Sequence, residues 1–404
     1  MTKEKSTVPR LRFPGFTDAW KQRKLGEYFV ERLECSAEGE LLSVTISDGV
    51  RRFSELGRKD NSSEDKTKYK VLKQGDIVYN SMRMWQGASG YSTYDGIVSP
   101  AYTVLIPTYL SYALFFSYLF KRSSSLQIFQ VNSQGLTSDT WNLKYKPFSN
   151  IVFPAPTLPE QEAIGSFFSD LDQLITLHQR KLDDIKELKK ALLQKMFPKG
   201  NGNDFPELRF PEFTDTWKQR KLGEVAEKVS QKNLDRQYVE TFTNSAEFGI
   251  ISQRDFFEKN ISSLDNISGY YIVSPDDFVY NPRISNLAPV GPIKRNKLGR
   301  VGVMSPLYTI FRFSDIHLDF VEKYFDTTIW HRYMELNGDS GARSDRFAIK
   351  DSVFKGLPIP LPTLPEQEAI GSFFSDLDQL ITLHQRQLDH LKLLKKALLQ
   401  QMFI

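Results

Sequence analysis

The chain has 404 residues, of which 40 % are hydrophobic and 25 % are charged, as in ordinary folded domains. Its length predicts two or more domains, and its net charge of +4 is compatible with a nucleic-acid partner without establishing one. The single cysteine, Cys35, excludes an internal disulfide and favours a reducing compartment. The polar start, Met1 to Arg10, is not a secretory signal, and the apolar stretch Tyr109–Phe120 is too short to span a bilayer. We therefore expect a cytoplasmic protein.

The first element along the chain is a motif that occurs twice. Leu11 to Glu27 reads LRFPGFTDAWKQRKLGE, and Leu208 to Glu224 reads LRFPEFTDTWKQRKLGE, so only two positions differ. A second, longer match relates Pro156–Phe197 to Pro362–Phe403, with five differences. The chain is therefore a tandem duplication, in which an opening motif, an insert and a helix block are followed by the same series again.

The two inserts, residues 28–155 and 225–361, share only traces, such as Val78-Tyr79-Asn80 against Val279-Tyr280-Asn281. A duplication under no functional constraint would drift evenly along its length. Here the opening motifs and the helix blocks, which together we call the frame, are nearly identical between the repeats, whereas the inserts have diverged. This contrast predicts one fold with two different surfaces, in which the frame has one role performed twice and the inserts have two separate roles.

Short runs of β-branched and aromatic residues, separated by Gly, Asn, Asp and Pro, predict strands in both inserts. The runs are Leu41–Ile46, Asp76–Tyr79 and Ile97–Ile106 in the first insert and Tyr270–Val273, Phe278–Tyr280 and Val301–Phe313 in the second. Each insert also contains an apolar segment of helical character, Leu110–Phe120 or Leu318–Met334. We expect each insert to be a compact α+β domain.

Basic and amide side chains gather in the predicted loops of both inserts. Lysine suits contact with phosphate, whereas arginine, asparagine and glutamine can read base edges through paired hydrogen bonds. Any one of these residues alone is an ordinary solvated surface group, and it is their grouping that indicates DNA as a partner. The candidate DNA contacts are Arg51, Arg52, Arg58, Lys59, Arg83 and Gln134 in the first insert and Arg254, Arg283, Lys294, Arg295, Lys297, Arg343 and Arg346 in the second.

The helix block has no proline from Glu160 to Phe197, and its apolar residues recur at heptad spacing. At about 1.5 Å per residue each helix would be roughly 55 Å long, and such a stripe must be buried against another helix. Its duplicate is the obvious partner, which predicts a pseudo-twofold arrangement. The expected seam is Ile164, Phe167, Leu171, Leu174, His178, Leu188 and Leu192 in the first copy and Ile370, Phe373, Leu377, Leu380, His384, Leu394 and Leu398 in the second.

His178 and His384 occupy equivalent places in the two seams, where a shared metal site and a polar residue that fixes register are the alternatives. We favour the register role, because neither helix contains a cysteine and the first helix contains no second histidine. The chain has no phosphate-binding loop of the ATPase type and no zinc-ligand cluster. Tyr280-Asn281-Pro282-Arg283 only superficially matches the motif of amino-methyltransferases, since it lacks the second proline and the aromatic residue. We expect no catalytic, cofactor-binding or metal-binding residues on this chain.

The Leu-Pro-Glu-Gln-Glu block with its heptad helix, present twice, resembles the specificity subunit of Type I restriction–modification systems, as do the paired opening motifs. The resemblance covers essentially the whole chain, and the duplicated block is specific. It implies an α+β fold in which two β-rich target-recognition domains are separated by two long antiparallel coiled-coil helices. The implied boundaries are residues 1–155 and 204–361 for the recognition domains and residues 156–203 and 362–404 for the helices and linker.

The same resemblance implies that the chain itself is non-catalytic and reads a bipartite, asymmetric site in double-stranded DNA. It further implies assembly with two methyltransferase subunits and with restriction translocase–nuclease subunits, which would carry S-adenosylmethionine, ATP and Mg²⁺. The inserts match the family only in outline, so no base contact is carried over. Two other functions stay open at this point: a coiled-coil adaptor whose inserts bind peptides, and a self-contained DNA methyltransferase.

Overall fold

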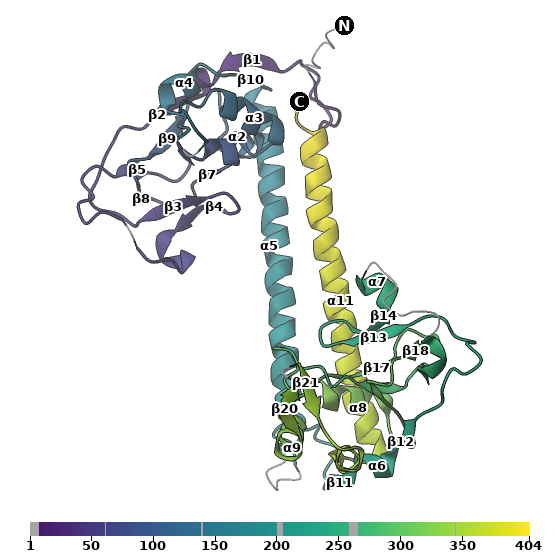
Figure 1. The fold of residues 1–404 in the computed structure, drawn as a ribbon. Coiled ribbons are helices and arrows are strands. Elements are labelled where there is room, and N and C mark those ends of the chain that lie inside the picture. Colours follow the sequence, from purple (N-terminus) through teal and green to yellow (C-terminus); the bar gives the residue numbers. More distant parts are fainter. Residues whose placement is uncertain (1–7, 61, 139, 200–204, 258–265, 344) are drawn as a thin grey trace. The chain divides into compact units, whose positions relative to one another are not determined.

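The computed structural model describes residues 8–404 except 61, 139, 200–204, 258–265 and 344. The chain divides into two compact units. The first unit comprises the chain up to Arg180 together with Arg386–Ile404, and the second comprises Lys181–Gln385. Each unit contains one insert and parts of both long helices, α5 (Leu158–Lys195) and α11 (Leu364–Gln401), which Figure 1 shows as unbroken helices. No helix in the described ranges is both long enough and apolar enough to span a membrane.

The first insert is built on a four-stranded antiparallel sheet with the order β2-β9-β6-β7, accompanied by the pairs β3-β4, β5-β8 and β1-β10. The strands are β1 (Lys21–Lys24), β2 (Phe29–Glu31), β3 (Leu42–Thr45), β4 (Gly49–Arg52), β5 (Lys70–Leu72), β6 (Ile77–Asn80), β7 (Ser89–Tyr91), β8 (Gly96–Val98), β9 (Tyr102–Pro107) and β10 (Val152–Ala155). The helices of the insert are α1 (Leu25–Tyr28), α2 (Ala113–Phe120), α3 (Ser123–Val131) and α4 (Tyr145–Ser149). Because β1 of the opening motif pairs with β10, the strand that leads into α5, the motif closes the domain.

The second insert repeats this topology strand for strand, with a β12-β19-β16-β17 sheet and the pairs β13-β14, β15-β18 and β11-β22. The strands are β11 (Lys218–Lys221), β12 (Ala226–Val229), β13 (Phe242–Ser245), β14 (Gly249–Ser252), β15 (Tyr271–Val273), β16 (Phe278–Tyr280), β17 (Ile293–Arg295), β18 (Gly302–Met304), β19 (Thr309–Phe313) and β22 (Pro358–Leu361), with an additional hairpin β20 (Asp339–Arg343) and β21 (Arg346–Ala348). The helices are α6 (Leu222–Val225), α7 (Gln253–Phe257), α8 (Leu318–Phe325), α9 (His331–Asn337) and α10 (Asp351–Phe354). The expected α+β class and the tandem repeat are confirmed.

Three of the predicted runs are each divided by a turn. Ile97–Ile106 forms β8 and β9, because the backbone turns after Val98 and the Tyr102 amide donates to the Ser99 carbonyl at 3.0 Å. Leu318–Met334 forms α8 and α9, which are separated by a turn in which the Thr327 hydroxyl donates to the Tyr324 carbonyl at 2.7 Å. Val301–Phe313 forms β18 and β19, which are separated by a turn in which the Tyr308 amide donates to the Ser305 carbonyl at 3.0 Å. In all three runs most of the apolar residues are buried, so hydrophobicity alone could not reveal the break.

In each unit the insert packs its apolar helix across a long helix at a glycine. A methyl group added at Gly165 of α5 would lie 2.7 Å from the backbone nitrogen of Phe115 in α2. A methyl group at Gly371 of α11 would lie 2.9 Å from the backbone nitrogen of Phe320 in α8. The glycine within each predicted helix is therefore explained by close packing against the insert.

The two long helices run antiparallel within each unit. In the first unit Asp172 of α5 accepts from Lys395 of α11, and Gln179 accepts from Lys392. The residue numbers rise along one helix as they fall along the other. In the second unit Lys189 of α5 donates to Asp378 of α11 at 2.5 Å. The expectation of two long antiparallel helices is confirmed.

The predicted seam consists of two heptad lines, one through Ile164 and Ile370 and one through Phe167 and Phe373, and only the first line is correct. Its first line holds, since Ile164, Leu171, Ile370 and His384 are buried and Leu192, Leu377 and Leu398 pack against the cores. His178 is half-buried. Its second line is wrong, because Leu174, Leu188, Leu380 and Leu394 are between 38 and 52 % exposed. Phe167 and Phe373 are half-buried and pack their rings against Phe13 and Phe210 of the opening motifs.

The second line of the seam lies one residue further along each helix. Phe168, Leu182, Phe374 and Leu388 are buried, and Met196 and Met402 continue the same heptad positions. This line also contains Lys189 and Lys395, whose charges interrupt the apolar pattern in the sequence. Each lysine fits there because an aspartate of the other long helix lies beside it.

A candidate nucleic-acid interface on a repeated frame

In each unit the opening motif contacts the long helix of the same repeat through a buried ion pair. Arg12 of the first opening motif donates from Nε and Nη2 to the Glu160 carboxylate at 2.6 and 2.7 Å, and the Glu160 side chain is fully buried. The hydrogen bond to Glu160 raises the pKa of Arg12. Arg209 and Glu366 repeat the arrangement in the second unit at 2.7 Å for both bonds. A bidentate pair of this kind fixes orientation as well as distance.

The glutamine after each of these glutamates fastens the insert to the frame. Gln161 accepts a hydrogen bond from the Tyr112 amide at 2.9 Å and donates to the carbonyls of Leu110 and Pro156. Gln367 accepts from the His317 amide and donates to the Pro362 carbonyl. The Glu-Gln pair therefore joins the long helix to the opening motif and to the insert at once, which explains why it stands in both repeats.

A third contact joins each insert to both long helices. In the first unit the Asp172 carboxylate accepts from the Tyr118 hydroxyl at 2.7 Å and from Lys395. In the second unit the Asp378 carboxylate accepts from Lys323 and from Lys189, both at 2.5 Å. The aspartate and the helix lysine belong to the repeat, while the insert supplies a tyrosine in one unit and a lysine in the other. Inserts of different sequence are thus held by the same pair of helix residues.

Two segments of the first insert are brought together on one surface. The segment after β6 carries Arg83, and the segment after α3 carries Gln134. The Leu143 amide donates to the Ser81 carbonyl at 2.8 Å, which ties the two segments together. Arg83 and Gln134 are both exposed, and Arg83 donates to Gln86 at 3.0 Å.

Two tryptophans stiffen this surface. The rings of Trp85 and Trp141, one from each segment, meet edge to face at 5.1 Å. Trp85 also donates from Nε1 to the Met82 carbonyl at 3.1 Å. A rigid surface with an exposed arginine and an exposed glutamine has the groups needed to read base edges.

The second insert repeats the arrangement with different side chains. The Phe347 amide donates to the Pro282 carbonyl at 2.7 Å, so the segment after β16 is tied to the β20-β21 hairpin. The backbones of Arg283 and Arg346 form an antiparallel β-bridge across this contact. Arg346 is partly buried, with the Asp345 carboxylate at 4.0 Å. The side chain of Arg343 lies outside the described residues.

The other candidates of the first insert lie on or near the β3-β4 hairpin. Arg51 and Arg52 are each a little under half exposed, and Arg52 forms an ion pair with Glu40 at 3.3 Å and stacks over the Tyr94 ring. Arg58 and Lys59 are exposed in the following loop. In the second insert Arg254 is exposed on α7, directly after Gln253, which lines a cavity together with Asn281 and Arg283. Arg283 and Arg254 are therefore on neighbouring segments.

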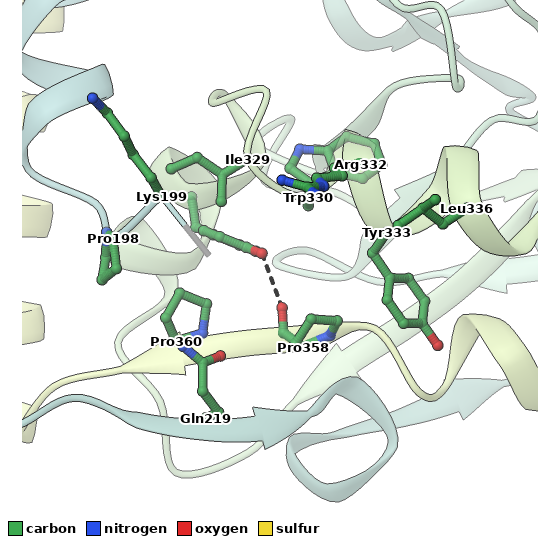
Figure 2. Close-up of a pocket in the computed structure, with 11 residues that line it drawn as sticks. Pro198, Lys199, Gln219, Ile329, Trp330, Arg332, Tyr333, Leu336, Pro358 and Pro360 are labelled. Atoms are coloured by element: carbon green, nitrogen blue, oxygen red, sulfur yellow. Dashed lines mark hydrogen bonds between the residues drawn. The ribbon is translucent and has the colours of Figure 1, made fainter. Parts of the chain in front are cut away.

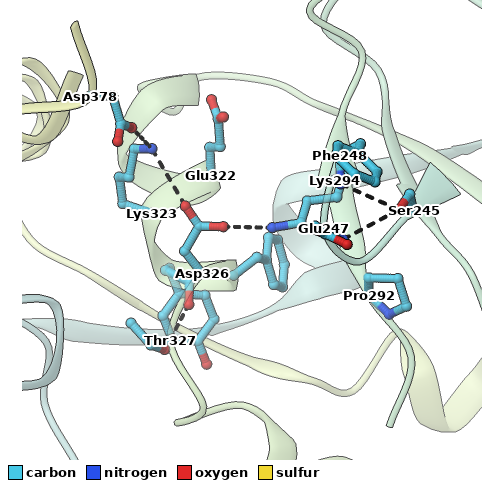
Figure 3. A network of polar contacts seen from close by, with 12 residues as sticks. Ser245, Glu247, Phe248, Pro292, Lys294, Glu322, Lys323, Asp326, Thr327 and Asp378 are labelled. Carbon is cyan, nitrogen blue, oxygen red and sulfur yellow. Dashed lines mark hydrogen bonds and ion pairs between the residues drawn. The ribbon is translucent and has the colours of Figure 1, made fainter. Parts of the chain in front are cut away.

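Three candidates of the second insert are instead held in ion pairs inside the domain. Lys294 donates to Asp326 at 2.8 Å, and Figure 3 shows this carboxylate between Lys294 and Lys323. Arg295 contacts Asp276 and Asp319, each at 2.6 Å, and Lys297 contacts Glu322 at 3.0 Å. Contact with a phosphate would have to compete with these carboxylates.

A groove of about 620 Å³ in the second unit is lined mainly by prolines and aromatic residues (Figure 2). Trp330 forms part of its wall and donates from Nε1 to the Phe325 carbonyl at 3.2 Å. The Tyr324 hydroxyl donates to the Pro358 carbonyl at 2.9 Å. These polar groups serve the wall itself. Among the described residues, no three histidine, cysteine, aspartate or glutamate side chains are placed to hold a metal ion.

Sequence reasoning missed the frame contacts. Arg12 and Glu160 are 148 positions apart, and no periodicity connects them. One signal was available: both residues are charged, and both recur unchanged in the second repeat as Arg209 and Glu366. A pair of opposite charges kept in two copies of a motif is the pattern expected of a buried ion pair.

Comparison with known proteins bears on what this frame supports. Residues 19–187 and 214–393 match the family described as the Type I restriction modification DNA specificity domain. The chain belongs to this family. The two matched stretches correspond to the two repeats, so each unit of this specificity subunit carries one DNA recognition domain.

Two relatives agree with this assignment. A protein of Methanocaldococcus jannaschii named for the specificity subunit of the type I restriction enzyme MjaX is 25 % identical over 422 residues, which cover 95 % of this chain and 88 % of that protein. The MjaVIII specificity subunit of the same organism is 23 % identical over 265 residues, which are 63 % of this chain and 61 % of that protein. The crystal structure of the type I restriction-modification S subunit from M. genitalium has the same fold, with a TM-score of 0.55 at 14 % identity over 98 % of this chain and 99 % of that one.

Proposed function

We propose that this specificity subunit reads a bipartite, asymmetric site in double-stranded DNA, with each insert reading one half. The observation that carries the proposal is the repeat of one topology with two surface chemistries. The first insert presents Arg83 and Gln134 beside two tryptophans, whereas the second presents Arg283 at a paired hairpin. Identical domains would read identical half-sites, so two different domains should read two different half-sites.

Exchange of one insert tests this proposal. Residues 225–361 are replaced by the corresponding insert of a relative, and Arg209, Glu366 and Gln367 are retained so that the frame contacts can form. The methylated motif is then determined by sequencing. We expect one half-site to change and the other to stay. A change in both half-sites would contradict independent reading by the two inserts.

We further propose that methyltransferase subunits bind to leucines exposed on the long helices, and that methyl transfer and ATP-driven cleavage belong to partner subunits. In the first unit Leu174 and Leu177 of α5 are 40 and 64 % exposed. Their equivalents in the second unit, Leu380 and Leu383 of α11, are 38 and 51 % exposed. An apolar stripe on a helix indicates a protein contact, and its occurrence in both units fits two copies of one partner.

Native mass spectrometry of the co-expressed complex tests the stripe. Leu177→Glu and Leu383→Glu are equivalent changes in the two units, and each should remove one methyltransferase subunit, while the double variant should lose both. Leu33→Glu is the control, because Leu33 is 74 % exposed but lies in the first insert. Full occupancy in the double variant would show that the subunits bind elsewhere.

A further inference from the structure

The first unit contains a cleft of about 810 Å³ whose lining is strongly basic. Its walls come from the tip of the β3-β4 hairpin, the end of α2, α5 and the last turns of α11. Six basic side chains and two acidic ones line it: Arg51, Lys121, Arg122, Lys392, Lys395, Lys396, Asp48 and Asp172. This excess of positive charge is local, since the whole chain carries only +4.

Several of these cations lack a carboxylate partner among the described residues. Lys121 donates to the Ile46 carbonyl at 3.2 Å and Lys392 to the Gln179 amide oxygen at 3.3 Å, which are neutral acceptors. Lys395 uses Asp172, and Lys396 forms no ion pair with any described residue. Burial lowers the pKa of Lys121 and repulsion by Lys395 lowers it further, and these effects outweigh the attraction by Asp48 and Asp172. An anion placed in the cleft would relieve this repulsion.

The second unit neutralises the same place by itself. The helices α2 and α8 both end in phenylalanine, and the next residue is Lys121 in the first unit but Asp326 in the second. The Asp326 carboxylate lies 2.8 Å from Lys294 and 3.4 Å from Lys323 (Figure 3). Burial opposes its ionisation, but Lys294 and Lys323 hold the pKa of Asp326 below its ordinary value. The repeat thus supplies the same helix lysines to both units, and the inserts decide whether their charge is cancelled.

We propose that the cleft of the first unit holds the phosphodiester backbone of double-stranded DNA, and that the equivalent region of the second unit does not. The inference rests on the proposed function and adds an asymmetry to it: the first unit would contribute affinity independent of sequence. Lysine and arginine side chains bind phosphate by charge and release counterions, and this makes binding dependent on salt. The cleft would also set the position of the first insert along the duplex.

The test uses the full chain with its methyltransferase subunits and measures the affinity for a duplex containing the recognised site and for an unrelated duplex, across salt concentrations. The variants are Lys121→Gln and Lys396→Gln. The matched control is Lys190→Gln, because Lys190 occupies the place of Lys396 in the second unit. Each cleft variant should weaken binding to both duplexes by the same factor and reduce the slope of log affinity against log salt by about one. Lys190→Gln should leave the slope unchanged.

The possible failures are distinguishable. If the unaltered complex shows no salt-dependent affinity for DNA, the proposed function itself fails. If it binds DNA but both cleft variants keep the original slope, or if Lys190→Gln has the same effect as Lys396→Gln, the cleft inference alone is overturned. Binding of inorganic phosphate that depends on Lys121 without any change in the DNA slope would likewise overturn it, because the cleft would then be a site for small anions.

Discussion

Loss of the buried arginine of the frame should destabilise one unit and leave the other intact. Arg12→Met removes both hydrogen bonds to Glu160, whose side chain is fully buried. Removing one partner of a buried pair costs about 3–5 kcal/mol, because the remaining charge loses its compensation. Arg209→Met should cost about 1 kcal/mol less, because Glu366 keeps a hydrogen bond from the Trp217 indole at 3.2 Å.

Hydrogen exchange followed by mass spectrometry resolves the two units in one experiment. Peptides from the β1-β10 pair report on the first unit, and peptides from the β11-β22 pair report on the second. A cost of about 3–5 kcal/mol lowers protection by roughly a hundredfold or more, since each 1.4 kcal/mol is tenfold. Arg12→Met should therefore deprotect β1 and β10 by this factor and leave β11 and β22 as they were.

A double variant separates loss of the pair from loss of the charge. Replacing Arg12 and Glu160 together by methionine removes the uncompensated carboxylate, so protection should recover part of what Arg12→Met loses. If the double variant is no better protected than Arg12→Met, or if both units lose protection equally, the assignment of the ion pair as the local clamp of the first unit is refuted.

Three further predictions follow from the same contacts. Gly165→Ala should lower the thermal midpoint, although alanine favours a helix by about 1 kcal/mol, because its methyl group would lie 2.7 Å from the Phe115 nitrogen; a raised midpoint would contradict this packing. The fragment 1–203 should form a dimer by light scattering, with Phe197 of each copy taking the place of Phe403, which packs in the first core; a folded monomer would contradict it. The pKa of Asp326 is held below the ordinary 3.8, so its ion pairs should stabilise the second unit fully above that pH and be lost as pH falls through the lowered value. Asp326→Asn should therefore flatten the dependence of the urea midpoint on pH between about 2 and 5. An unchanged dependence would rule this out.

The frame was predictable from sequence because its signals are local or repeated. The absence of proline after Glu160 and the heptad spacing gave the long helices to within a few residues. The seam was harder, since charge interrupts both heptad lines in the sequence: the line through Leu174 contains Lys181, and the buried line contains Lys189. Only the position of Asp378 on the other helix shows why a lysine belongs there.

The candidate interface was less predictable for a physical reason. A basic residue in a loop has the same sequence signature whether it faces solvent or an internal carboxylate. Arg83 proved exposed, whereas Lys294 and Arg295 are paired with acids of their own domain. The basic cleft was not anticipated, because Lys121 and Lys396 are distant in sequence and meet only through the packing of α2 against the long helices.

The most direct test of the proposed bipartite reading is whether a methylation pattern depends on the chain. The chain is expressed with the proposed methyltransferase subunits in a host that lacks other adenine methylation, and the genome is sequenced by a method that detects methylated bases. The account predicts one asymmetric motif made of two different half-sites with a fixed unspecific gap, which disappears when the chain is omitted. A single uninterrupted motif, two identical half-sites in inverted orientation, or methylation that persists without the chain would contradict it.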